Sequence, residues 1–121
     1  MRLQFFGAAR EVTGSKHLIT TERGTKILLD CGLFQGIQTH ELNQEFGFDP
    51  KEIDYVILSH AHIDHSGLLP RLVKKGFQGP VYATSATASL CQIMLLDSAY
   101  IQEKDVKLLN ERRIRQGRPT L

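Results

Sequence analysis

The sequence contains few cysteines and no long apolar run, and both absences exclude whole classes of protein. Cys31 and Cys91 are the two cysteines among 121 residues, and neither belongs to a C-x-x-C pair. We therefore expect buried thiols rather than a disulfide framework, although Cys31 follows Asp30 and could approach a metal. No apolar stretch reaches the roughly 18 residues of a membrane span, and the apolar start of the chain lacks the flanks of a secretory signal. The sequence thus predicts a cytoplasmic protein with no membrane partner.

A strong excess of one charge and a biased composition are also missing. Fifteen Lys and Arg residues against 13 Asp and Glu residues give a net charge of +2, which permits an anionic partner without arguing for one. Hydrophobic residues make up 41% and charged residues 23% of the chain, as in a soluble globular protein. The length allows at most one domain, in which about two-thirds of the surface is buried on folding.

Hydrophobic periodicity and turn residues predict a mixed α/β fold. Strands are expected at residues 3–6, 17–21, 26–30, 53–58 and 81–84. Helices are expected near residues 40–44, at 68–75, where Gly76 suits the C-terminal cap, and at 86–101. The first three strands should form an antiparallel meander with a hairpin turn at 22–25. The strand at 53–58 is apolar enough to be buried on both faces.

The residues after Gln102 are polar and mostly basic. The cations are Lys104, Lys107, Arg112, Arg113, Arg115 and Arg118. A solvated helix is the ordinary interpretation of such a run, and contact with nucleic acid is the minority one.

Four metal-binding side chains follow the strand expected at 53–58. His60, His62, Asp64 and His65 stand in the order H-x-H-x-D-H. Neutral imidazoles and carboxylates bind zinc and similar divalent ions. In an extended segment His60 and His62 point to one side, whereas Asp64 and His65 turn round the corner. Such a cluster can serve one or two metals, so we predict a metal site at a strand-to-helix junction.

These ligand types indicate hydrolysis. A metal with an open position lowers the pKa of bound water to about 7, and two ions roughly 3.5 to 4 Å apart can share a hydroxide and hold the oxyanions of a phosphodiester. Asp30 ends a strand at a similar edge of the sheet, where it could accept a hydrogen bond from a ligand imidazole and fix its tautomer. A simple turn residue at the end of a strand is an equally good interpretation of Asp30.

Two segments resemble the first two motifs of the metallo-β-lactamase superfamily. They are ILLDCG at 27–32 and HAHIDH at 60–65. The glycine-rich loop at 7–15, together with segments 32–36, 46–50 and 81–84, is similar to the bacterial β-CASP branch, whose members are RNA-processing nucleases. This similarity extends over nearly the whole chain up to about Lys104.

The resemblance implies an α/β (α+β) fold, the N-terminal half of a metallo-β-lactamase αββα sandwich. It also implies two zinc ions and endonucleolytic or exonucleolytic cleavage of RNA, with a metal-bound hydroxide attacking the phosphodiester. By motif, His60 and His62 would bind one zinc, and Asp64 and His65 the other. Asp64 and Asp30 would be the catalytic carboxylates, Asp30 by supporting the site.

The later ligands of that family are missing from these 121 residues. No histidine follows His65, and Asp97 and Asp105 do not match the motif of the bridging aspartate, so neither is assigned to a metal. We expect residues 1–121 to be the N-terminal part of a metallo-β-lactamase-fold domain, without its second half and β-CASP insertion. The remainder of the same polypeptide would complete the site, an open apolar face would favour association such as a homo-oligomer, and the isolated chain would be inactive.

Several alternatives stay open on the sequence alone. The same cluster would serve a hydrolase of thioesters, lactones or lactams, or a nuclease acting on DNA. A non-catalytic module that binds RNA or serves assembly is a further alternative, although the intact cluster favours an enzyme. Iron or manganese could occupy the same ligands.

Overall fold

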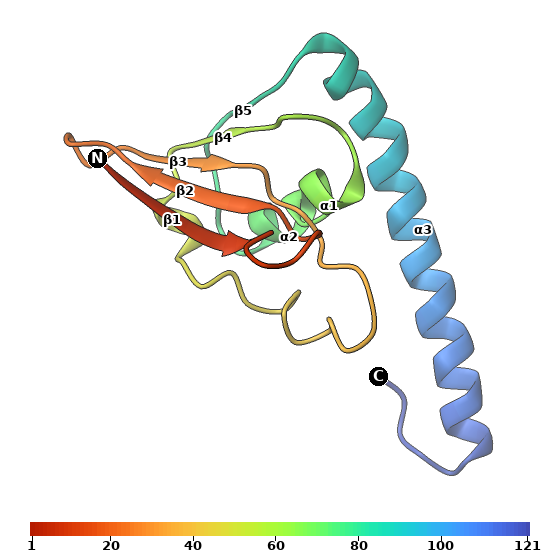
Figure 1. Cartoon of the computed structure of the whole chain (residues 1–121). Coiled ribbons are helices and arrows are strands. Elements are labelled where there is room, and N and C mark those ends of the chain that lie inside the picture. Colours follow the sequence, from red (N-terminus) through yellow and green to blue (C-terminus); the bar gives the residue numbers. More distant parts are fainter.

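The computed structural model describes residues 1–121 and contains a five-stranded sheet with helices on one side (Figure 1). The strands, in their order across the sheet, are β1 (Arg2–Gly7), β2 (Lys16–Thr20), β3 (Lys26–Leu29), β4 (Tyr55–Ile57) and β5 (Val81–Tyr82). The helices are the 3-10 helix η1 (Pro50–Glu52), α1 (Ile63–Ser66), α2 (Leu69–Lys74) and α3 (Ser85–Arg115). Helix α3 runs alongside α1 and extends well past the sheet (Figure 1).

The sheet combines antiparallel and parallel strands. β1, β2 and β3 form the predicted antiparallel meander, and the hairpin between β2 and β3 turns at Gly24, whose φ is +85°. β4 pairs with β3, and β5 with β4, in parallel. Parallel neighbours need a crossover connection, and α1 and α2 supply it between β4 and β5. The mixed α/β fold predicted from the sequence is confirmed.

The hydrophobic core lies between one face of the sheet and the helices. Leu28 of β3, Val56 of β4 and Leu72 of α2 each have 0% of their surface exposed. They belong to a cluster of 13 buried residues that also takes in Cys91 of α3. Burial of this cluster is what fixes the sheet, α2 and the first turns of α3 relative to one another.

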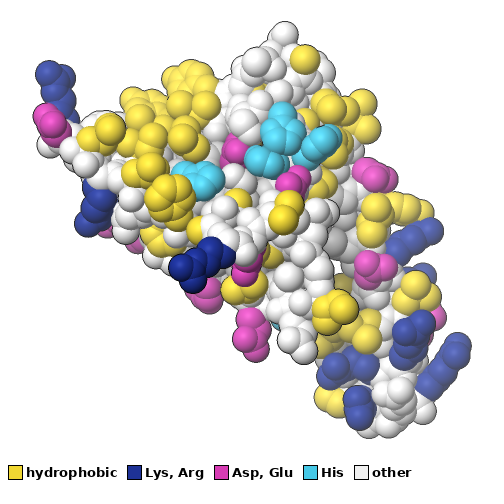
Figure 2. Space-filling view, in the orientation of Figure 1, with side chains coloured by type: hydrophobic (Ala, Val, Ile, Leu, Met, Phe, Trp, Pro, Cys, Tyr) yellow, Lys and Arg dark blue, Asp and Glu magenta, His cyan; other side chains and the backbone are white.

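The opposite face of the sheet carries two rows of mostly apolar side chains. Cross-strand partners give one row of Leu3, Ile19, Ile27 and Tyr55, and a second row of Phe5, His17, Leu29, Ile57 and Tyr82. Phe5 is 60% and Tyr82 55% exposed. Figure 2 shows the apolar area over the strands beside the histidines. A contiguous apolar face of this kind normally marks an interaction surface.

Strand β4 is shorter than predicted and is not buried on both faces. Val56 is fully buried, but its neighbours Tyr55 and Ile57 are 39% and 42% exposed. Successive side chains of a strand point to opposite faces, and the helices cover only one of them. The prediction of burial on both faces was therefore wrong.

Two helix predictions need correction. Residues 40–44 form turns, because the Asn43 side chain binds the backbone of Phe34 and fixes the loop, with Oδ1 accepting from the Phe34 amide at 2.8 Å and Nδ2 donating to its carbonyl at 2.9 Å. The helix expected at 86–101 continues to Arg115, since no glycine or proline interrupts it before Gly117. The basic residues other than Arg118 therefore lie in the C-terminal half of α3, where Lys and Arg gather in Figure 2. None of the helices has the combination of length and apolarity needed to cross a bilayer.

Candidate metal centre

The four predicted metal ligands lie where the chain leaves β4 and enters α1. β4 ends at Ile57 and α1 begins at Ile63, so two of the ligands precede the helix and two lie within its single turn. The histidine side chains gather on one face of the molecule, next to a carboxylate (Figure 2). The junction of strand and helix predicted from the sequence is present.

The ligand atoms converge on a small volume. One ligand atom each from His60, His62 and Asp64 lies within 4.8 Å of the other two. Nε2 of His65 lies 3.4 Å from Oδ2 of Asp64, and the rings of His60 and His65 are 3.9 Å apart. Ligand atoms bound to zinc at about 2.0–2.2 Å are separated by no more than about 4 Å. The donor set therefore fits a zinc-like ion once the side chains draw closer together.

Asp30 connects β3 to this cluster. It is 6% exposed and has a φ of +60°, which turns the chain out of the strand and toward the histidines. Its Oδ2 lies 2.7 Å from Nδ1 of His65, and its Oδ1 accepts a 2.7 Å hydrogen bond from the amide of Ser59. Because a carboxylate accepts, the His65 proton belongs on Nδ1, which leaves Nε2 free beside Asp64. The hydrogen bond predicted between Asp30 and an imidazole of the histidine cluster is present.

Ser59 plays a matching part that the sequence analysis missed. Its hydroxyl donates to Oδ2 of Asp30 at 2.8 Å and lies 2.9 Å from Nδ1 of His60. A hydroxyl has one proton, and here it is directed to the carboxylate, so the His60 ring donates from Nδ1 to the Ser59 oxygen. Both rings are thereby set to offer Nε2. The one feature of the sequence that could have indicated this role is the position of Ser59 between the strand and the first histidine.

Backbone hydrogen bonds from two neighbouring loops hold the segment that carries the predicted ligands. The amide of Ser15 donates to the carbonyl of Asp64 at 2.9 Å, and the amide of Cys31 donates to the carbonyl of His65 at 2.8 Å. A Cβ added at Gly32 would lie 1.6 Å from the Asp64 oxygen, so glycine is required there. In the glycine-rich loop, a Cβ at Gly7 would lie 1.8 Å from the carbonyl oxygen of Gly14. Glycine at positions 7 and 32 therefore allows the backbone segments to approach this closely.

Cys31 does not join the ligand group. The side chain is fully buried, and desolvation by that burial raises the pKa of its thiol to about 12. Metals bind the thiolate rather than the thiol. Cys31 and Cys91 are both free and buried, as predicted.

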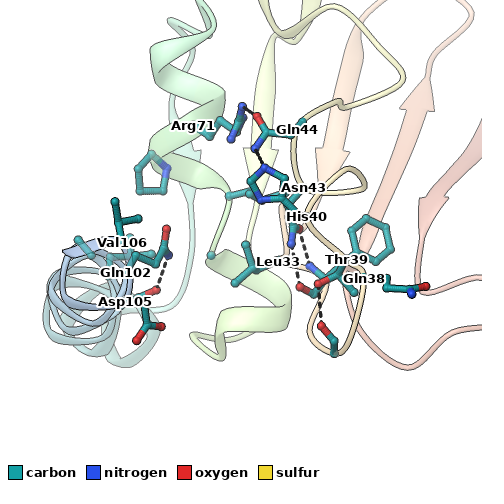
Figure 3. Close-up of a pocket in the computed structure, with 18 residues that line it drawn as sticks. Leu33, Gln38, Thr39, His40, Asn43, Gln44, Arg71, Gln102, Asp105 and Val106 are labelled. Atoms are coloured by element: carbon teal, nitrogen blue, oxygen red, sulfur yellow. Dashed lines mark hydrogen bonds between the residues drawn. The ribbon is translucent and has the colours of Figure 1, made fainter. Parts of the chain in front are cut away.

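A hollow of the molecule lies apart from the predicted ligand cluster. It has a volume of about 660 Å³ and lies between the loop after β3, Arg71 and α3, and none of the four ligands lines it. In Figure 3 the Arg71 guanidinium points to Gln44, which in turn points to His40. The metal-ligand cluster is instead on the open surface, so it is accessible to a large substrate.

Comparison with known proteins identifies the family. Residues 11–116 match the family described as the metallo-beta-lactamase superfamily. The chain belongs to the metallo-beta-lactamase superfamily. This confirms the family inferred from the two motifs at 27–32 and 60–65.

Curated relatives in this superfamily include proteins with RNA-processing names. The chain is 53% identical over 104 residues to Ribonuclease TTHA0252 of Thermus thermophilus, a match that covers 86% of this chain and 24% of the relative. It is 38% identical over 110 residues to transcription termination factor FttA of Methanosarcina mazei, covering 88% of this chain and 17% of the relative. The chain thus spans a quarter or less of the length of these relatives. The name of the ribonuclease relative agrees with the nuclease branch that the sequence resemblance indicated.

Solved structures agree with the fold. A metallo-beta-lactamase with a HARLDQ motif from Cronobacter sakazakii superimposes with a TM-score of 0.52 at 30% identity, over 72% of this chain and 30% of that one. This partial overlap fits the N-terminal half of the metallo-beta-lactamase fold.

Proposed function

We propose that this protein is a metal-dependent ribonuclease that hydrolyses RNA phosphodiester bonds. The observation that carries the proposal is the convergence of His60, His62 and Asp64 within 4.8 Å of one another at an exposed edge of the sheet. The 53% identical relative is named a ribonuclease, which supports RNA as the substrate and partner. The alternatives are another hydrolase of the superfamily, acting on a thioester, lactone or lactam, and a non-catalytic RNA-binding module.

Zinc is the proposed metal, with two ions in the completed site. His60 and His62 would hold one ion, and Asp64 and His65 the other, since Nε2 of His65 and Oδ2 of Asp64 lie side by side. A divalent ion bound there would lower the pKa of water and neutralise charge on the scissile phosphate. The donor set of nitrogen and carboxylate oxygen suits zinc.

Asp30 and Ser59 keep the ligands in the binding form. Oδ2 of Asp30 accepts a hydrogen bond from Nδ1–H of His65, and the Ser59 oxygen accepts one from Nδ1–H of His60. Each ring is then fixed in one orientation with its Nε2 lone pair free. Asp64 and Asp30 are the carboxylates proposed to act in catalysis, Asp64 at the metal and Asp30 through His65.

We also propose that residues 1–121 are the N-terminal part of a metallo-β-lactamase-fold domain. The remainder would contribute further ligands and cover the two apolar rows, in which Phe5 and Tyr82 are more than half exposed. The 24% coverage of the ribonuclease relative supports this proposal. On this basis the isolated chain is inactive, and the complete protein acts on RNA in the cytoplasm.

The test compares the complete reading frame, sequenced beyond the Leu121 codon, with residues 1–121 alone. Each protein is incubated with end-labelled single-stranded RNA, with zinc or with a chelator. We expect cleavage by the complete protein that requires zinc, is lost in His62→Ala, and persists in the control His40→Ala, whose ring lies in the separate hollow.

Single-stranded DNA, a lactone and a thioester are assayed beside the RNA. Faster turnover of one of these would replace RNA as the substrate. RNA binding without cleavage, unaffected by the chelator, would favour the non-catalytic module. Zinc-dependent cleavage by residues 1–121 alone would contradict the proposed inactivity of the isolated chain.

A further inference from the structure

Lys16, at the start of β2, is an unusual residue to find inside this protein. Its side chain has 0% of its surface exposed. Lysine is almost never fully buried unless its ammonium is paired, and Lys16 takes part in none of the ion pairs of the structure. Neither the proposed ligands nor the hydrophobic core accounts for a buried cation at this position.

The Lys16 ammonium is held by two backbone carbonyls and an aromatic ring. Nζ donates to the carbonyl of Gly14 at 3.0 Å and to the carbonyl of Gly32 at 2.9 Å. It also lies 4.1 Å from the centroid of the Phe34 ring, close enough for a cation–π interaction. These contacts tie the glycine-rich loop before β2 to the segment that follows β3.

Both tied segments contact the metal-ligand helix directly. Ser15, next to Gly14, donates from its amide to the carbonyl of Asp64 at 2.9 Å and accepts from the amide of Gly32 at 2.9 Å. Cys31, next to Gly32, donates to the carbonyl of His65 at 2.8 Å. The two residues that accept hydrogen bonds from Lys16, Gly14 and Gly32, are therefore each next to a residue that contacts the backbone of α1.

The buried charge has an energetic cost that a simple packing role would not require. Desolvation lowers the pKa of Lys16 to about 8. An unbranched apolar side chain of similar length would fill the same space without that cost, but it would leave the Gly14 and Gly32 carbonyls without this donor. The specific contribution of the ammonium is its simultaneous donation to two carbonyls.

We propose that Lys16 is a positioning residue for the metal centre, which joins the Gly14 and Gly32 carbonyls and so holds the loops that place Asp64 and His65. The inference rests on the proposed function, because it assumes that these residues bind metal. Lys16 touches neither the metal nor the substrate and acts through the backbone of the two loops.

The test uses Lys16→Met, which keeps the length of the side chain and removes the donor. Lys26→Met is the control, because Lys26 lies in β3 and pairs with Glu52 away from the ligands. The first readout is amide hydrogen exchange without metal. We expect the amides of Ser15, Cys31 and Gly32 to exchange about ten-fold faster in K16M, while those of buried strand residues stay unchanged.

The second readout is zinc affinity, measured by competition with a chromophoric chelator. We expect K16M to bind zinc about ten-fold more weakly than the unchanged protein, and K26M to bind within two-fold of it (about 0.4 kcal/mol). Lys16→Gln, whose amide can still donate, should recover part of the affinity. It also replaces K16M in both measurements if K16M does not fold.

The outcomes separate this inference from the proposed function. Zinc binding by the unchanged protein, with equal binding by K16M, overturns the role of Lys16 alone. Faster exchange spread evenly over the whole sheet also overturns it, since Lys16 would then serve general stability. If the protein from the complete reading frame binds no zinc at all, the proposed function is overturned, and the positioning role with it.

Discussion

The stability of this protein should depend on pH in a way set by two buried neighbours, Lys16 and Cys31. Burial lowers the pKa of Lys16 from 10.5 to about 8, and burial raises the pKa of the Cys31 thiol from 9.0 to about 12. After desolvation, each group is the largest single influence on the pKa of the other. Both shifts disfavour a charged group in the interior.

The two groups change stability in opposite directions. Between pH 8 and 10.5 the unfolded chain keeps the Lys16 proton that the folded protein releases, so the free energy of unfolding rises with pH, by about 3 kcal/mol in total. Between pH 9 and 12 the unfolded chain loses the Cys31 proton that the folded protein keeps, so stability falls by about 1.4 kcal/mol per pH unit. The sum is a rise of about 1 kcal/mol from pH 7 to 9, a plateau to about pH 10.5, and then a decline.

Cys31→Ala separates the two contributions. The variant lacks the opposing thiol, so its free energy of unfolding should keep rising to about pH 10.5 and gain about 3 kcal/mol from pH 7. Urea denaturation of the metal-free protein at half-unit steps of pH measures both curves. Only the slopes are compared, because the smaller side chain also lowers stability equally at every pH.

A particular result would refute this reasoning. If the Cys31→Ala curve runs parallel to that of the unchanged protein between pH 9 and 10.5, the thiol is not the opposing group. If the unchanged protein shows no rise from pH 7.5 to 9, and Lys16→Met gives the same curve, the ammonium is not desolvated as its burial indicates.

Three further predictions use the same denaturation assay. Gly32→Ala should lower the free energy of unfolding by more than about 3 kcal/mol, because its Cβ would lie 1.6 Å from a carbonyl oxygen. Gly24→Ala should lower it by only about 1 kcal/mol, because the backbone there has a φ of +85° but a Cβ would have nothing within 4 Å. Equal losses would contradict the steric explanation. Leu28→Ala should lose about 2–5 kcal/mol, and a smaller loss would mean that the core relaxes around the vacated space. Zinc at one hundred times its Kd should add about 2.7 kcal/mol, a gain that His62→Ala removes if the proposed ligand set is right.

Local sequence patterns were sufficient for most of the fold. Alternation of apolar residues located the strands of the meander, and Gly24 marked the hairpin turn because that turn needs a positive φ. The apolar run at 53–58 was harder to interpret. An uncovered face and a buried face both carry apolar residues here, so the sequence could not reveal that Tyr55 and Ile57 face away from the core.

The candidate site was only partly predictable for a related reason. Ligand types and their spacing predicted His60, His62, Asp64 and His65 as metal ligands, and the end of β3 indicated Asp30. Lys16 and Ser59 gave no comparable signal, because lysine is usually solvated and serine is common in loops. Their contacts join segments that are 16 and 29 residues apart in the chain, Lys16 to Gly32 and Ser59 to Asp30.

The order and direction of the strands explain why these segments meet. β2 runs antiparallel to β3, so the start of β2, with Ser15 before it, lies beside the end of β3, where Asp30 follows. β4 runs parallel to β3, so its end, and the histidines after it, reach the same edge of the sheet. Three separate connections therefore converge on one edge by topology alone. Any further ligand must come from a segment that also reaches this edge.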